Sequence, residues 1–179
     1  MNELKRIIGP LLLGVLAFGS APAAAFSQED ALRHRQALGL FEDACLRLAP
    51  EFTGAEAVFG SLGLQRPAEA SAYRNPELEI YGGVVPMQAG DIFGRQCTVM
   101  LGRGNLAVLV LGLRTALDRM AEPGTLAETP PSREEDPVLW DFRLPRIGAV
   151  SVTAGLGQQG IAVMGMQVAE RDSSNGAGE

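Results

Sequence analysis

Two cysteines in two different kinds of predicted element constrain this chain more than any other feature. Cys45 lies in the segment 28–48, where apolar residues recur at steps of three and four and so predict an amphipathic helix. The apolar stripe of that helix consists of Leu38, Phe41, Cys45 and Leu48. Cys97 lies in the segment 95–101, where the alternation of side chains predicts a strand with Cys97, Val99 and Leu101 on one face. The simplest arrangement packs the helix on a sheet, so that the two sulfur atoms meet between them.

We therefore predict a disulfide bond between Cys45 and Cys97. Each thiol lies on the core face of its own element, and in an oxidising compartment each has one available partner. Two separate buried thiols are the alternative. A thiol redox protein is disfavoured, because reactive cysteine pairs usually lie close in sequence with one thiol exposed.

The first 25 residues have the organisation of a secretory signal peptide. Residues 1–6 form a short basic segment, residues 7–19 form an apolar segment, and small residues follow at 20–25. We predict cleavage after Ala25, with Ala23 as the alternative last residue of the signal. Export to a bacterial periplasm follows from this organisation.

An uncleaved membrane anchor is the alternative to a cleaved signal. The uncharged run from residue 7 to residue 28 is long enough to span about 30 Å of hydrocarbon. Prolines and glycines interrupt this run, and its second half is rich in alanine rather than leucine, so cleavage is favoured. We then expect one folded domain at 26–169, a disordered tail at 170–179, and no membrane contact after cleavage.

Composition supports a single domain and excludes some partners. The chain has 179 residues, of which 46% are apolar, which suffices for one core without a metal ion. Its formal net charge is -6, which argues against nucleic acid or an anionic membrane surface as a partner.

Periodicity and breakers place three helices and five strands. We expect the helices at 28–48, 54–62 and 106–121, and the strands at 78–81, 95–101, 138–144, 147–153 and 161–169. The two glycines at 82–83 allow a bend or bulge after the first strand, before residues 84–86. Residues 107–111 are alternatively a buried strand, but the apolar stripe runs through Met120 and favours a helix. Because the strands come in consecutive runs, the fold class is α+β: a single domain with an antiparallel sheet of about five strands and two or three helices packed on one face, in the order ααββαβββ.

Capping signals mark the starts of the first two helices. Ser27 is placed to cap the first, with Glu29 and Asp30 near the positive end of its dipole. Thr53 and Glu56 have the spacing of a capping box for the second.

The groups that catalysis or metal binding would need are few. His34 is the only histidine, and its position between Arg33 and Arg35 predicts a solvated side chain. One histidine and two distant cysteines give no ligand cluster for zinc or haem, and the acidic residues 134–136 are expected to form a solvated loop. We therefore expect no catalytic residue, no metal and no cofactor.

The chain is accordingly interpreted as an exported, non-catalytic periplasmic protein that binds a protein partner or a small ligand. The alternative is a carboxylate-dependent periplasmic hydrolase, in which Asp91, Asp141 and Glu51 would converge in the fold and perform acid and base catalysis.

The segment 82–94 is the candidate partner contact. Met87, Ile92 and Phe93 are apolar, whereas the nearby glycines and Pro86 are expected to prevent a regular strand. Apolar side chains on an irregular surface segment are typical of a partner contact. The alternative is that this segment folds back and covers one edge of the sheet.

Overall fold

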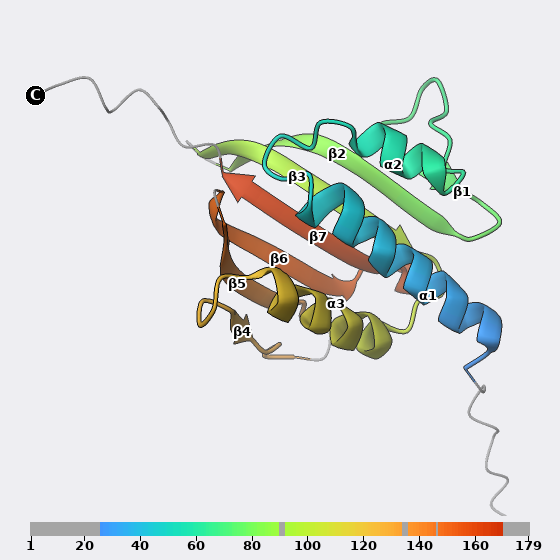
Figure 1. Cartoon of the computed structure of the whole chain (residues 1–179). Coiled ribbons are helices and arrows are strands. Elements are labelled where there is room, and N and C mark those ends of the chain that lie inside the picture. The colour runs from blue at the N-terminus through green and yellow to red at the C-terminus, as the bar shows by residue number, and fades with distance from the viewer. Residues whose placement is uncertain (1–25, 90–91, 134–135, 146, 170–179) are drawn as a thin grey trace, which may run out of the picture.

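The computed structural model describes residues 26–89, 92–133, 136–145 and 147–169, which form one α+β domain. The described residues build a seven-stranded antiparallel sheet, and the three α-helices all lie on one of its faces (Figure 1). The signal peptide predicted at 1–25 and the tail predicted at 170–179 lie outside the described residues.

The strand order across the sheet is β1-β2-β3-β7-β6-β5-β4. The helices are α1 Gln28–Phe41, α2 Ala55–Ser61 and α3 Leu106–Met120, and α1 continues into a π-helical turn, η1, at Glu42–Leu46. The strands are β1 Tyr73–Asn75, β2 Ile80–Ala89, β3 Ile92–Leu101, β4 Ala127–Thr129, β5 Val138–Leu144, β6 Gly148–Leu156 and β7 Ala162–Ala169. A short 3₁₀ turn, η2, spans Gln158–Gly160 between β6 and β7.

The predicted fold class is confirmed, and the sheet is larger than expected. All five predicted strands are present, and β5 has the predicted bounds. The two additional strands, β1 and β4, lie at the sheet edges and have three residues each. Three residues are too few to show an alternating pattern, so these two strands could not be predicted from periodicity.

The prediction of an irregular connection at 82–94 is wrong for its described residues: residues 82–89 and 92–94 belong to two regular, paired strands. β2 pairs with β3 without interruption from Ile80 opposite Leu101 to Ala89 opposite Ile92. Gly82 serves packing rather than a bend, because a Cβ there would lie 2.7 Å from Cε1 of Phe59 in α2. Pro86 is tolerated because β1 pairs only with residues 80–82 of β2, which leaves Pro86 on an edge strand.

The core lies between the sheet and the helices, and the predicted disulfide crosses it. Cys45 in η1 and Cys97 in β3 are both fully buried and are bonded to each other, with their Cα atoms 5.4 Å apart. Both thiols therefore face inward, as their spacing predicted. Such a bond is consistent with an oxidising compartment outside the cytoplasm.

One of the two predicted helix caps is confirmed and the other is wrong. Ser27 and Asp30 form a reciprocal capping box at the start of α1. The proposed box of Thr53 and Glu56 does not form, because α2 begins after Gly54, which adopts a left-handed conformation with φ of 89° and has no side chain to cap. None of the helices in the described residues is long and apolar enough to cross a membrane.

Candidate functional site

The first turns of α1 carry two polar side chains that are buried. Arg33 is 5% exposed and His34 is 2% exposed, so the prediction of a solvated His34 is wrong. His34 lies two helical turns before the buried Phe41, on the stripe that also contains Cys45. Extending that stripe toward the N-terminus would have predicted that His34 is buried. The prediction of a solvated side chain was based instead on the two flanking arginines.

His34 joins α1 to the start of α3 through both ring nitrogens. Its Nε2 lies 2.7 Å from the backbone nitrogen of Asn105, the N-cap residue of α3. Because a backbone N–H only donates, Nε2 accepts this bond, and Nδ1–H donates to the carbonyl oxygen of Asp30 at 2.6 Å. With both nitrogens bound to the backbone, the ring acts as a structural connection rather than a free base.

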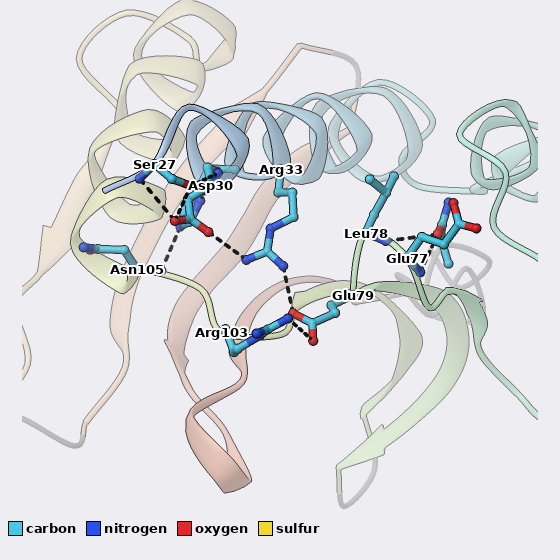
Figure 2. A network of polar contacts seen from close by, with 10 residues as sticks. Ser27, Asp30, Arg33, Glu77, Leu78, Glu79, Arg103 and Asn105 are labelled. Carbon is cyan, nitrogen blue, oxygen red and sulfur yellow. Dashed lines mark hydrogen bonds and ion pairs between the residues drawn. The ribbon is translucent and has the colours of Figure 1, made fainter. Parts of the chain in front are cut away.

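A network of ion pairs surrounds Arg33 and connects α1 to the strand ends (Figure 2). Its Nη1 donates to Oε2 of Glu79 at 2.7 Å and its Nη2 to Oδ1 of Asp30 at 3.1 Å. Arg103 binds both oxygens of the same Glu79 carboxylate, each at 2.8 Å. Nε of Arg33 has no hydrogen-bond partner among the described residues.

These contacts keep the network charged. The hydrogen bonds from the side chain and backbone of Ser27 lower the pKa of Asp30. The hydrogen bonds from Arg103 and then Arg33 lower the pKa of Glu79, and the Glu79 carboxylate raises the pKa of Arg103. A hollow of about 400 Å³ borders the network. Since its carboxylates and guanidinium groups are already paired, the network fixes α1 on the sheet and offers little to a ligand.

Glu51 and Asp141, two of the three carboxylates of the predicted hydrolase, do not come together. Glu51 borders a hollow of about 570 Å³ beside α2, on the side of the sheet that the helices cover. Asp141 lies in a different hollow on the opposite face of the sheet, and Asp91 lies outside the described residues.

The hollow that contains Asp141 is the best candidate for a binding site. It has a volume of about 630 Å³ and lies on the face of the sheet that no described helix covers. Its lining residues are Met87, Thr125, Ala127, Asp141, Phe142, Arg143, Ala149, Val150, Ser151 and Gln167. Met87, one of the predicted contact residues, therefore faces this hollow. The side chains of Ile92 and Phe93, the other two, lie outside the described part of the structure.

A polar row of four side chains crosses this uncovered face. Strand pairing aligns Gln96 of β3 with Gln167 of β7, Gln167 with Ser151 of β6, and Ser151 with Asp141 of β5. The Ser151 hydroxyl donates to Oδ1 of Asp141 at 2.5 Å. Among the described residues, neither glutamine side chain makes a hydrogen bond with another residue. The polar row therefore presents free donors and acceptors at the surface.

Small residues keep the neighbouring part of the face shallow. Gly165 lies between Thr98 and Thr153 in the next row of paired residues. A Cβ at Gly165 would lie 3.3 Å from Oγ1 of Thr153 and 3.4 Å from Nε2 of Gln96. A larger residue there would press on the Gln96 amide, whereas glycine leaves the amide in place.

Sequence reasoning located the strands of this face but missed the polar row. The signal was present in the outward positions of β5, β6 and β7, which carry polar residues at the same level of the sheet. Aligning them requires the strand order, and the sequence did not provide that order.

Within the described residues, no three histidine, cysteine, aspartate or glutamate side chains are grouped as ligands for a metal ion. In comparisons with known proteins, no protein-family model, no curated protein and no solved structure matches this chain.

Proposed function

We propose that this protein is an exported, non-catalytic binding protein, and that its partner or ligand occupies the hollow on the uncovered face of the sheet. The observation that carries the proposal is the polar row, which places unused hydrogen-bonding groups beside a hollow of about 630 Å³. The signal peptide predicted at 1–25 and the Cys45–Cys97 disulfide support a periplasmic location.

An antiparallel sheet can leave one face to water, so an uncovered face alone does not indicate binding. This face differs from a merely solvated one in two respects. It is hollowed, and ligand sites are usually concave with a few convergent polar groups. It also brings the half-buried thioether of Met87 next to these polar groups, and methionine is enriched in interfaces.

A carboxylate-dependent hydrolase has less support. Acid and base catalysis needs both groups within reach of one substrate. Glu51 and Asp141 lie on opposite faces of the sheet, so they cannot act on the same bond.

A matched pair of substitutions tests the proposed site. Ala149→Trp places a large side chain in the hollow, whereas Ala107→Trp places the same side chain on the exposed surface of α3. Each tagged, exported variant is used to capture partners from the periplasm of its own host, and bound proteins and small molecules are identified by mass spectrometry. We expect Ala107→Trp to retain the molecules that the wild type captures and Ala149→Trp to lose them, with similar melting temperatures. Equal capture by both variants would refute the site.

A further inference from the structure

We infer that the occupant of the uncovered face is an extended segment of a partner protein that places a lysine or arginine side chain on Asp141. This inference rests on the proposed function and adds the chemistry of the ligand. It follows from the charge of the hollow and from the direction of the polar row.

Asp141 provides a negative charge that pairs with no described residue. The carboxylate is exposed, its Oδ1 accepts the hydrogen bond from Ser151, and it forms no ion pair with a described residue. Arg143 lies two residues further along β5 and also lines the hollow, but its Nε lies 3.6 Å from Oε2 of Glu122. Because Arg143 pairs with Glu122, Asp141 is the one charged residue among the described lining of the hollow that has no ion-pair partner.

The net charge of the whole chain acts in the same direction. It is -6, so long-range electrostatic attraction favours a basic partner. The negative net charge also disfavours nucleic acid as a partner, and the Asp141 carboxylate would repel its phosphates.

The polar row indicates an extended ligand rather than a small amine. Neighbouring strands lie about 4.8 Å apart, so the row from Gln96 to Asp141 spans three such spacings, or about 14 Å. An extended peptide rises about 3.4 Å per residue, so about four residues cover this distance. A single ammonium group would contact Asp141 and leave the two glutamine amides unused.

The two kinds of group in the row have different roles in recognition. A glutamine amide both donates and accepts, so Gln96 and Gln167 can bind the N–H and C=O groups of any peptide backbone. Asp141 only accepts when it is ionised, so it selects a cationic side chain. The hydroxyl of Ser151 donates to one carboxylate oxygen, Oδ1, and the other, Oδ2, receives no hydrogen bond from a described residue.

The test uses the disulfide-bonded domain and a defined probe. The capped peptide Ala-Ala-Ala-Ala-Arg-Ala-Ala-Ala-Ala, with four residues on either side of its arginine, is titrated into the isotopically labelled protein, and backbone amide shifts are followed by NMR. The same peptide with glutamine in place of arginine, and a capped single arginine, are titrated in parallel. We expect the arginine peptide to shift amides in the segments 94–98, 139–143, 149–153 and 163–167, and to bind more tightly than either of the other two.

Two protein variants of equal net charge separate local recognition from general attraction. Asp141→Asn removes the carboxylate of the row, and Asp118→Asn removes an exposed carboxylate on α3 that pairs with no described residue. We expect Asp141→Asn to weaken binding of the arginine peptide about tenfold or more, as for the loss of a hydrogen bond to a charged group. Asp118→Asn should bind it like the wild type.

Four outcomes would overturn the inference: equal binding of the arginine and glutamine peptides, wild-type binding by Asp141→Asn, equally tight binding of single arginine, or no shifts at millimolar peptide. None of these outcomes refutes the proposed function. If Ala149→Trp loses its captured molecules while Asp141→Asn retains them, the site stands and only its preference for a basic peptide is wrong. Retention by Ala149→Trp would refute the site itself.

Discussion

The same strands present buried apolar side chains on the covered face of the sheet and more exposed polar side chains on the uncovered face. On β7, the buried Met164, Met166 and Val168 face the helices, whereas the exposed Gln167 between them faces the hollow. On β6, Val152 is fully buried, whereas Ser151 beside it belongs to the polar row. Because successive side chains of a strand alternate between faces, one residue contributes to stability and the next to the candidate site.

The two faces also differ in whether their polar side chains are hydrogen-bonded within the protein. On the covered side, Arg33 and His34 are buried and bound to neighbouring groups, as burial of polar groups requires. On the uncovered side, the partly buried Gln96 and the exposed Gln167 make no side-chain hydrogen bond with another described residue. The comparison indicates that substitutions on the covered face change stability, and that those on the uncovered face change binding.

One of the largest effects should come from the disulfide that crosses the covered side. Replacing both Cys45 and Cys97 with alanine opens a loop with a sequence separation of 52 residues. The chain-entropy estimate for such a loop is about 4 kcal/mol. This is a large share of a typical stability of about 5 to 15 kcal/mol. Urea denaturation of the double variant measures the loss, and a loss under about 1 kcal/mol would contradict this assignment of stability.

The second prediction compares one ion pair from each side. Glu79→Gln leaves the buried Arg33 guanidinium with a single carboxylate partner, Asp30, and should lower the free energy of unfolding by about 2 kcal/mol. Glu122→Gln breaks the pair between Glu122 and Arg143, whose side chains are 41% and 57% exposed, respectively. This change should alter the free energy of unfolding by less than about 1 kcal/mol. Denaturation of both variants under the same conditions checks the difference. Equal losses would show that burial does not distinguish the two pairs.

The fold was predictable where one residue pattern governs an element. The strand Val138–Leu144 and the helix Leu106–Met120 agree with their alternation and apolar stripe to within a residue. The disulfide followed because both cysteines lay on clear core faces. These features depend on local periodicity, which a single sequence contains.

The remaining features depend on contacts between distant residues. Gly82 and Pro86 indicated an irregular segment, but the ring of Phe59 and the edge position of β2 explain both in a regular strand. His34 is buried because Asn105 in another element provides a partner. The polar row requires the strand order, and its function could not be predicted from the separate positions of its members.

The third prediction concerns acid. The pKa values of Asp30 and Glu79 are lowered from their ordinary values of 3.8 and 4.5 by the hydrogen bonds from Ser27, Arg103 and Arg33. A lowered pKa in the folded state means that the stabilisation is fully present above these ordinary values and is lost as the pH falls through and below them. We expect the free energy of unfolding to decrease from pH 5 to pH 3, and to decrease less in Glu79→Gln. An identical pH dependence in the variant would show that the network does not contribute.

The smallest effect on stability should come from the uncovered face, and adjacent residues of β7 provide the test. Met166→Ala removes a fully buried side chain and should lower the free energy of unfolding by about 2 to 5 kcal/mol. Gln167→Ala removes an exposed side chain that makes no hydrogen bond within the described protein, and should change the free energy by less than about 0.5 kcal/mol. Urea denaturation of both variants, at two protein concentrations, provides the comparison. If Gln167→Ala loses more than about 1.5 kcal/mol, this side chain is covered in solution, and a dependence of that loss on protein concentration would identify a second copy of the chain as the cover. If Gln167→Ala is neutral but binds the arginine peptide less tightly, the free amide serves the ligand, which is the role that the difference between the two faces assigns to it.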